Sequence, residues 1–241
     1  MQIAIVVYPG MTALDAIGPY EVFNFTPGVE IRFVSDVAGP IVTDSGVLVI
    51  AATHSYGETP KPDIVLVPGS SADTTTAMAN GKLLTWLKQV HQTSQLTLSV
   101  CSGALVLGAA GILEGHAATT HWIGQKALSS FGAEARRSER VVKSGKIMTA
   151  AGVSAGIDLA LTVVKELYGQ QRAEIIQLLI EYDPQPPVDS GHTEKASKAV
   201  YEIAKAEMIQ AAKNPRNAIY VPKILWSQLL KKIRKKQALK K

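Results

Sequence analysis

The 241-residue sequence is poor in cysteine, and Cys101 is its only one. A single thiol excludes an intramolecular disulfide and favours a reducing compartment. The sequence contains no H-E-x-x-H motif and no pair of cysteines, so it indicates no metal site. Residues 1–8 lack a basic region and a cleavage site, and their apolar run is too short to span a bilayer. We therefore expect a cytoplasmic protein.

Charged residues make up 19% of the chain, and the formal net charge is +5. The basic excess collects beyond Thr193 and ends in a lysine-rich run at 231–241. The preceding residues are close to neutral, so the high isoelectric point describes a tail. We therefore expect a small-molecule ligand and no nucleic acid.

Short β-branched runs alternate with helix-length segments along most of the chain. This alternation predicts an α/β fold with a doubly wound, mostly parallel sheet, and ligands outside the carboxyl ends of its strands. A proline-rich segment at 183–191 separates a domain at 1–190 from a basic helical extension at 191–241. The predicted strands are 2–8, 30–35, 47–50, 63–67, 96–100 and 146–150, and the predicted helices are 17–25, 72–79, 81–92, 102–110, 122–131, 154–168, 194–211 and 223–238.

Cys101 lies between the apolar run at 96–100 and the helix-like run at 104–110. A side chain at such a strand-to-helix turn lies beside the helix amino terminus. Unpaired N–H groups there lower a thiol pKa, which favours a reactive thiolate at neutral pH. The alternative is that Cys101 is a small buried hydrophobic residue.

Three turns, at 8–10, 67–71 and 100–103, follow predicted strands, and we expect them to converge on one pocket. Asp15 follows the first strand among apolar neighbours. It either caps the helix that begins just after it, or lies over Cys101 as a general acid or base with a pKa raised by burial.

Further polar groups near these turns have two interpretations each. Ser102 either donates to a reacting group or water, or is a polar side chain of the first helical turn. The N–H groups of Gly69 and Ser70 suit an oxyanion-type role, although Pro-Gly is also a frequent turn. His121 is the candidate for a Cys–His pair, and its alternative is a packed structural histidine beside Trp122.

Residues 152–156 match the G-x-S-x-G pattern of serine hydrolases. In those enzymes an acid and then a histidine follow the serine, and here only His192 follows, in the proline-rich segment. We therefore interpret the two glycines as close-packing positions for the long helix near Cys101.

The tail contains a basic amphipathic helix with an apolar face. We expect this helix to dock on the domain or on a second subunit, and contact with a membrane surface is the alternative. The apolar face consists of Trp226, Leu229, Leu230 and Ile233.

Five segments together resemble the ThiJ/PfpI superfamily, which is class I glutamine amidotransferase-like, and within it the isonitrile hydratases. The resemblance covers residues 1 to about 190 and implies a flavodoxin-like fold, usually a homodimer, with a cysteine at the strand-to-helix turn. The segments are Leu14-Asp15 with Gly18-Pro19, the turn Pro68-Gly69, the run 99–113, Ala118 to Trp122, and Ala155 to Leu161.

For isonitrile hydratases, the resemblance implies a lyase that hydrates R–N≡C to an N-substituted formamide without metal or organic cofactor. Carried over, Cys101 attacks the terminal carbon to form a thioimidate, and Asp15 protonates or orients the intermediate and helps deliver water. Ser102 stands where the family commonly has threonine. Residues expected to contact the substrate or its developing charge are Gly69, Ser70, Val153, His121 and Trp122.

Peptidase-like and glyoxalase-like relatives often carry histidine directly after the cysteine and glutamate in the first loop. Ser102 and Asp15 differ from that pattern, which argues against a Cys–His hydrolase. One alternative function is a stress-protective member that acts on glyoxals or senses oxidation through Cys101. Another is a non-enzymatic sensor, but the region after 193 lacks the Gly-containing turn of a helix-turn-helix module.

Overall fold

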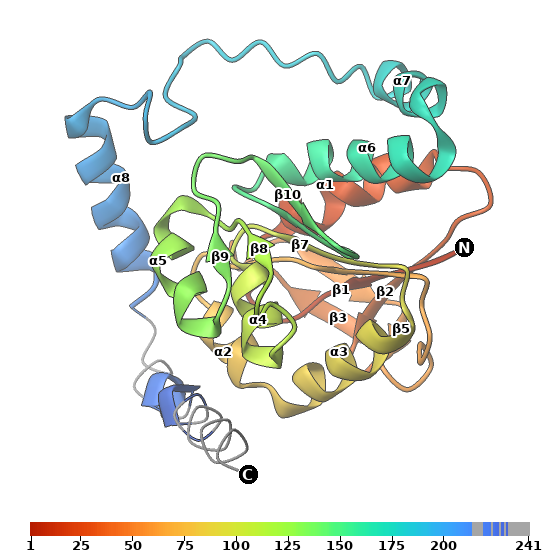
Figure 1. The fold of residues 1–241 in the computed structure, drawn as a ribbon, viewed down its shortest axis with the longest axis horizontal. Helices are drawn as coiled ribbons and strands as arrows, with labels where there is room; N and C mark the ends of the chain where they lie inside the picture. Colours follow the sequence, from red (N-terminus) through yellow and green to blue (C-terminus); the bar gives the residue numbers. More distant parts are fainter. Residues whose placement is uncertain (214–218, 223, 227, 229, 231–241) are drawn as a thin grey trace.

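The computed structural model describes residues 1–213, 219–222, 224–226, 228 and 230. Within these residues a seven-stranded sheet has the order β10-β11-β7-β6-β1-β2-β5 (Figure 1). Neighbouring strands pair in parallel except β10 and β11, which are antiparallel. The predicted mostly parallel, flavodoxin-like fold is therefore confirmed. The strands are β1 (Gln2–Val6), β2 (Glu30–Ser35), β5 (His54–Ser55), β6 (Ile64–Val67), β7 (Leu96–Val100), β10 (Val141–Ser144) and β11 (Ile147–Ala150).

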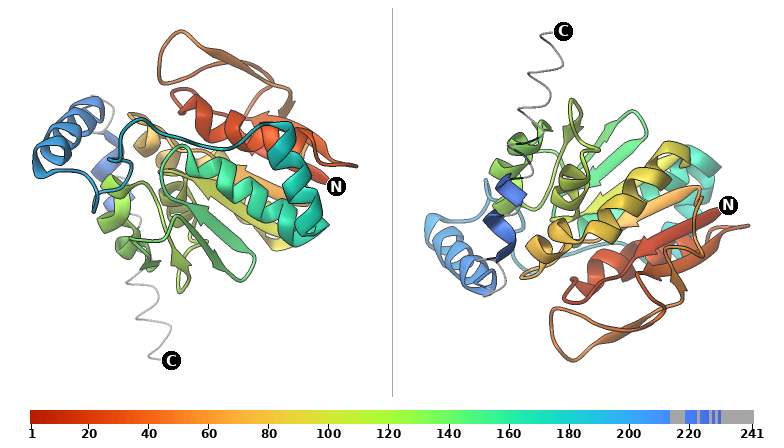
Figure 2. Two further views of the ribbon diagram at one scale, coloured as in Figure 1. Left: turned by 90° about the horizontal axis from the view of Figure 1, so that it is seen from above. Right: turned by 90° about the horizontal axis from the view of Figure 1, so that it is seen from below.

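Helices cover both faces of the sheet (Figures 1 and 2). On one face, α1 (Ala13–Asn24) packs against α6 (Ala155–Tyr168), and α7 (Gln170–Leu179) packs on α6. On the other face, α4 (Gly103–Ala110) packs against α3 (Gly81–Thr93) and α2 (Thr74–Ala79). The sequence analysis did not predict α7 or the edge strand β10, and it placed the start of α1 four residues too late.

The sequence of α3 shows why it is helical. Asn80 precedes the helix, and its side-chain oxygen accepts hydrogen bonds from the N–H groups of Lys82 and Leu83 at 3.1 and 3.2 Å. This cap satisfies two of the donors that every helix start leaves unpaired. Apolar residues recur at helical spacing and bury one face against the core. They are Leu83, Trp86, Leu87 and Val90.

Two predicted elements differ from the structure. The strand expected at 47–50 is β4 (Val49–Ala52), which forms a separate antiparallel hairpin with β3 (Gly39–Val42) and does not join the main sheet. A backbone hydrogen bond from Thr43 N to Leu48 O (2.9 Å) closes this hairpin. The helix expected at 122–131 is divided into the 3₁₀ turn η1 (Trp122–Gly124), α5 (Gln125–Leu128) and a second 3₁₀ turn, η2 (Ser129–Phe131). Close by, β8 (Ala117–Ala118) pairs in parallel with β9 (Glu134–Ala135).

Beyond α7 the chain crosses the molecule as an irregular segment before it enters α8 (Lys198–Ala211) (Figure 1). We call residues 182–195 the strap. The ring of Tyr201 in α8 lies 5.4 Å from that of Trp122, which joins α8 to the α/β body. The helix predicted at 194–211 is confirmed from residue 198.

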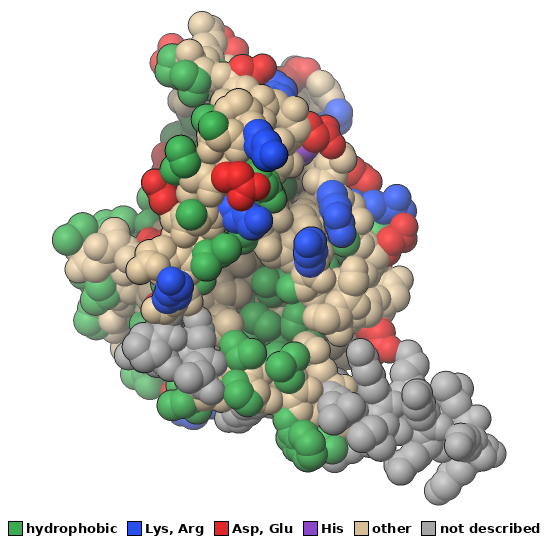
Figure 3. Space-filling model, turned by 90° about the vertical axis from the view of Figure 1, so that its left-hand side faces the viewer, with side chains coloured by type: hydrophobic (Ala, Val, Ile, Leu, Met, Phe, Trp, Pro, Cys, Tyr) green, Lys and Arg blue, Asp and Glu red, His purple; other side chains and the backbone are tan. Residues whose placement is uncertain are grey.

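The second predicted tail helix, at 223–238, falls mostly outside the described residues, as do Leu229 and Ile233 of its apolar face. Trp226, from the same face, is exposed. On the side of the molecule that carries α8, Lys and Arg side chains are interspersed with Asp and Glu side chains (Figure 3).

Candidate active site

Cys101 and Ser102 form the whole turn between β7 and α4. Cys101 has φ +57°, in the left-handed region that non-glycine residues seldom adopt. The next residue, Gly103, allows this turn to approach β6, because a Cβ there would lie 2.1 Å from Val67 O. The result is a strained strand-to-helix elbow of the kind that presents a nucleophile at a sheet edge.

Asp15 is fully buried in the first turn of α1. Its Oδ2 accepts a hydrogen bond from Gly69 N at 2.8 Å. Its Oδ1 is buried and has no hydrogen-bond partner among the described residues. The side chain therefore does not cap α1, as one interpretation of the sequence proposed, because α1 begins two residues earlier and the carboxylate points to another loop.

The electrostatics of Asp15 and Cys101 are linked. Burial raises the pKa of Asp15 to about 7, and the Gly69 hydrogen bond and the adjacent Cys101 thiol only partly oppose this effect. Burial, and then the negative charge of Asp15, raise the pKa of the Cys101 thiol, although the N–H and hydroxyl of Ser102 oppose the shift. The expectation of a thiolate activated by the helix amino terminus is therefore wrong, because desolvation outweighs the N–H groups.

The polar groups predicted to bind substrate near the elbow are engaged within the protein. Gly69 N donates to Asp15, and Ser70 N donates to Ser102 Oγ at 2.9 Å. Ser102 Oγ also lies 3.1 Å from Ser70 O and 2.7 Å from Thr74 Oγ1. In this structure the N–H groups of Gly69 and Ser70 do not form a free oxyanion site, because both already donate to side chains of the protein.

The three predicted turns do converge. Tyr8 Oη donates to Pro68 O at 3.0 Å, and Ser70 Oγ donates to Gly10 O at 2.5 Å. Tyr8 was missed as a functional candidate, although a phenol at the end of the first strand is a signal that the sequence offered. The hydrogen bond from Tyr8 holds Pro68 in place, and the next residue, Gly69, donates to the carboxylate of Asp15.

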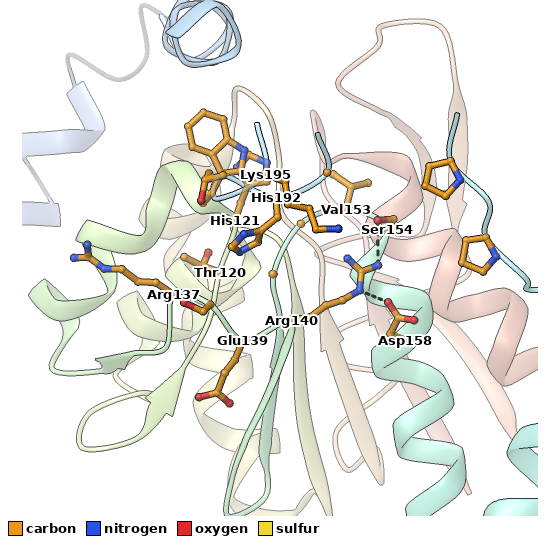
Figure 4. Close-up of a pocket in the computed structure, with 18 of the residues that line it drawn as sticks. Thr120, His121, Arg137, Glu139, Arg140, Val153, Ser154, Asp158, His192 and Lys195 are labelled. Atoms are coloured by element: carbon orange, nitrogen blue, oxygen red, sulfur yellow. Dashed lines mark hydrogen bonds and ion pairs between the residues drawn. The ribbon is translucent and has the colours of Figure 1, made fainter. Parts of the chain in front are cut away.

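A cavity of about 700 Å³ lies between the α/β body and the strap (Figure 4). Thr120 and His121 lie on one side of it, and Arg140 on the other side is joined to Asp158 and Ser154. The strap supplies a further wall, including Lys195. The predicted binding residues that line the cavity are His121, Trp122 and Val153.

Cys101 and Asp15 do not line this cavity themselves, but neighbours of both do. Leu14, which precedes Asp15, lines it, and so does Thr120, whose hydroxyl donates to Cys101 O at 2.8 Å. The cavity therefore reaches the immediate neighbours of both residues.

His121 packs against Trp122, with ring centroids 5.4 Å apart. Burial lowers the pKa of His121 and so favours its neutral form. Its Nδ1 has no hydrogen-bond partner in the part of the chain that the structure describes, and no hydrogen bond there joins it to Cys101. Asp15 is therefore the carboxylic acid beside the sulfur, and no Cys–His pair forms among the described residues.

Of the two glycines in the G-x-S-x-G segment, Gly156 is a close-packing position, whereas a Cβ on Gly152 would lie 3.6 Å from His121 Cδ2, an ordinary contact. A Cβ on Gly156 would lie 3.1 Å from the Pro19 ring and 3.2 Å from Val100, so α6 approaches both α1 and β7 closely. The hydroxyl of Ser154 accepts a hydrogen bond from Arg140 at 3.3 Å. These contacts give the segment a structural explanation.

The described residues contain no group of three or more His, Cys, Asp or Glu side chains placed to hold a metal ion. None of their helices is long and apolar enough to cross a membrane.

The chain is thus an α/β protein with a buried cysteine and a buried carboxylate near the carboxyl ends of its parallel strands. The model of the DJ-1/PfpI family matches residues 1–166. The chain is also 37% identical, over 205 residues, to an isonitrile hydratase from Pseudomonas putida. The matched region covers 85% of this chain and 89% of that protein. The chain belongs to the DJ-1/PfpI family.

Solved structures agree with this assignment. A ThiJ/PfpI family protein from Pseudomonas syringae has a TM-score of 0.83 and 38% identity, with 88% of each chain covered. Oxidized DJ-1 from Toxoplasma gondii has a TM-score of 0.66 and 21% identity, covering 76% of this chain and 99% of that one. The second likeness concerns the fold alone.

Proposed function

We propose that the protein hydrates isonitriles to N-substituted formamides, with Cys101 as nucleophile and Asp15 as the acid–base group. The observation that carries the proposal is the buried carboxylate beside the only thiol, with Oδ2 fixed by Gly69 and Oδ1 unpaired within the described structure. The similarity to the Pseudomonas putida isonitrile hydratase supports the same activity.

The first step uses the raised thiol pKa. An isonitrile carbon accepts a nucleophile and a proton at the same atom, so the reaction needs a group that moves a proton. The Sγ–C bond forms while the thiol proton passes to Asp15 Oδ1, and Asp15 then delivers that proton to the same carbon. The product is the thioimidate Cys101–S–CH=N–R, and Asp15 is again ionised. A pKa of about 7 suits both halves of this transfer.

The second step adds water. Asp15 removes a proton from water as its oxygen bonds to the thioimidate carbon, and the proton passes to nitrogen. The C–S bond of the resulting Cys101–S–CH(OH)–NH–R then breaks as the C=O bond forms, and the hydroxyl proton returns to sulfur through Asp15. The released product is R–NH–CHO, so one water has been added and the thiol is restored.

The groups around the pair have positioning roles in this proposal. Gly69 N fixes one carboxylate oxygen, which leaves the other for proton transfer. Ser102 joins the elbow to the turn at 67–71 through Ser70 and Thr74. Ser102 therefore maintains the approach of Asp15 to the sulfur, since small displacements of reacting groups cost large factors in rate.

The redox-sensing alternative is less well supported. Oxidation of cysteine follows thiolate character and exposure. Cys101 is only 5% exposed, and burial raises its pKa. Both properties count against a thiol that reacts readily with oxidants.

The assembly and organisation that the sequence indicates belong to the same proposal. We retain a homodimer, a cytoplasmic location, and the division into a domain at 1–190 and an extension at 191–241. Light scattering on the purified full chain measures the mass, and a monomer would overturn the homodimer.

The test of the activity is incubation of the purified chain with cyclohexyl isonitrile, followed by detection of N-cyclohexylformamide by proton NMR. We expect turnover by the wild type and none by the Cys101→Ala variant. The Ser154→Ala variant tests the competing interpretation that Ser154 of the G-x-S-x-G segment is the nucleophile, and we expect it to keep the wild-type activity within a few-fold. No formamide from the wild type, or equal amounts from Cys101→Ala, would overturn the proposal.

A further inference from the structure

The hairpin of β3 and β4 does not join the main sheet, yet its connecting loop is attached to the candidate active site. Gly10 N donates to Val42 O, and Asp44 N donates to Met11 O, both at 2.9 Å. Gly10 and Met11 belong to the loop that leads from β1 into α1. The backbone of the hairpin therefore places Asp44 beside the loop that precedes Asp15.

One oxygen of the Asp44 carboxylate joins two segments of the site. Asp44 Oδ2 accepts a hydrogen bond from Thr12 Oγ1 at 2.6 Å and another from Ser71 Oγ at 3.0 Å. Thr12 directly precedes α1, and Ser71 is the last residue of the turn at 67–71. Hydrogen bonds to an ionised acceptor are stronger than those between neutral groups, so a carboxylate suits this bridge better than a neutral side chain.

The same two segments carry the hydrogen bond that orients Asp15. Asp15 lies in the first turn of α1, and its Oδ2 accepts from Gly69 N in the turn at 67–71. Thr12 N also donates to Gly69 O, at 3.0 Å. Asp44 therefore supports, from the hairpin, the contact that leaves Asp15 Oδ1 for proton transfer. If the two segments separate, the carboxylate shifts relative to Cys101, and small displacements of reacting groups cost large factors in rate.

The side chain of Thr12 departs from the usual role of its position. A threonine just before a helix commonly accepts a hydrogen bond from an N–H group of the first turn. Thr12 makes no such hydrogen bond, and its hydroxyl donates to Asp44 instead. This position therefore serves the contact with the hairpin and not the capping of α1.

We propose that Asp44 is a positioning residue for the reaction: it bridges the start of α1 to the turn at 67–71 and so holds Asp15 in place. The inference rests on the proposed function for the reaction that is measured. Asp44 acts through the hydroxyls of Thr12 and Ser71 and takes no part in the bond changes at carbon.

The charge of Asp44 has a second effect on the site. Burial is the main cause that raises the pKa of Asp15, the Gly69 hydrogen bond and the Cys101 thiol lower it, and the negative charge of Asp44 raises it further. Loss of that charge therefore lowers the pKa of Asp15, and the pH midpoint of kcat/KM moves down with it. The titratable groups of this cluster are Asp15, Tyr8 at the end of β1, Cys101 at the elbow, Asp44 in the hairpin loop, and Asp73, which acts on Tyr8 from the residue before α2.

The test measures kcat/KM for cyclohexyl isonitrile between pH 5 and pH 9. At pH 8 we expect Asp44→Ala to lose roughly tenfold, because Asp15 is less well placed. Asp44→Asn keeps an oxygen that can accept both hydroxyls, so it retains most of the activity that Asp44→Ala loses, and its pH midpoint lies below that of the wild type. The matched control is Asp36→Asn, which removes the same charge from an exposed pair with Lys82 and keeps the wild-type rate and midpoint.

Thr12→Val removes one donor of the bridge and leaves the charge of Asp44 in place. We expect this variant to lose a few-fold in kcat/KM at pH 8, with the wild-type midpoint. In the Asp44→Ala background the same substitution should cost less than about twofold, because both changes break the same contact. Thr12→Val and Asp44→Asn decide the matter even if Asp44→Ala does not fold.

Wild-type kcat/KM in Asp44→Ala, or an unchanged midpoint in Asp44→Asn, would overturn the inference. If no isonitrile is hydrated, the proposed function fails, and NMR tests the role of Asp44 separately. We then expect the Gly69 amide to exchange its hydrogen at least about fivefold faster in Asp44→Ala than in the wild type. We also expect the carboxyl carbon of Asp15 to titrate at lower pH in Asp44→Asn. An exchange rate or a titration midpoint equal to that of the wild type would refute the positioning role.

Discussion

Replacement of Asp15 by Asn tests the buried carboxylate without a large change of volume. The amide oxygen can still accept the hydrogen bond that Gly69 N donates to Asp15 Oδ2. In the wild type, burial raises the folded-state pKa of Asp15 from 3.8 to about 7. Because the fold favours the protonated form, the stabilising contribution of this proton is present at low pH and is lost as the pH rises through about 7.

The magnitude follows from the shift. One pKa unit corresponds to about 1.4 kcal/mol. Between pH 5 and pH 8, Asp15 loses its proton in the folded state as the pH passes about 7, so the wild type loses about 3 kcal/mol of unfolding free energy from this group. Asp15 is fully buried, so solvent screening does not reduce this figure substantially. The Asp15→Asn variant has no such titration.

Urea denaturation of both proteins at pH 5, 6, 7 and 8 measures the effect, and titrating groups that do not interact with Asp15 cancel in the difference between them. We expect the stability of the variant relative to the wild type to increase as the pH rises, by about 3 kcal/mol between the extremes. Parallel pH dependences, within about 0.5 kcal/mol, would refute the raised pKa.

Three further substitutions test the positioning of the site. Tyr8→Phe removes the hydrogen bond that holds the turn before Asp15's partner, so we expect kcat/KM to fall about tenfold and stability by about 1 kcal/mol; unchanged kinetics would remove Tyr8 from the account. Gly103→Ala places a Cβ 2.1 Å from Val67 O and should cost more than about 2 kcal/mol in urea denaturation, whereas Gly81→Ala, with no atom within 4 Å, should gain about 0.5 kcal/mol. Equal effects of the two would contradict the packing at the elbow. Asn80→Ala removes the α3 cap and should lower the melting temperature by the equivalent of about 1 kcal/mol, and no change would show that the cap is not needed.

The parts of the fold that the sequence predicts are those with strong local patterns. The strand at 96–100 is entirely buried, and α4 after it is almost uniformly apolar, so the turn at Cys101 follows from the sequence alone. The edge strand β10 carries Lys143 and Ser144 and has little of the apolar signal of a buried strand. The strand predicted at 47–50 exists as β4, but its place in a hairpin depends on pairing with β3, which local propensity does not specify.

The sequence predicts which residues form the candidate site, but it does not predict their pKa values. Cys101 and Asp15 were identified from their places after strands, and the structure places them in one buried cluster. The predicted direction of the pKa shift of Cys101 was wrong, because the shift depends on how far burial removes water from the sulfur. No sequence motif gives that information. The cavity was not predictable, because its strap wall lies more than 60 residues along the chain from Thr120 and His121.

The most direct test of the account is a pH titration of the Cys101 thiolate by ultraviolet absorbance, taken as the difference between wild type and Cys101→Ala, alongside kcat/KM for cyclohexyl isonitrile. If Asp15 accepts the thiol proton during attack, kcat/KM rises with a midpoint of about pH 7 while no thiolate signal develops over that range. A thiolate signal that rises with the same midpoint as kcat/KM would contradict the account, because a preformed thiolate would then control the reaction.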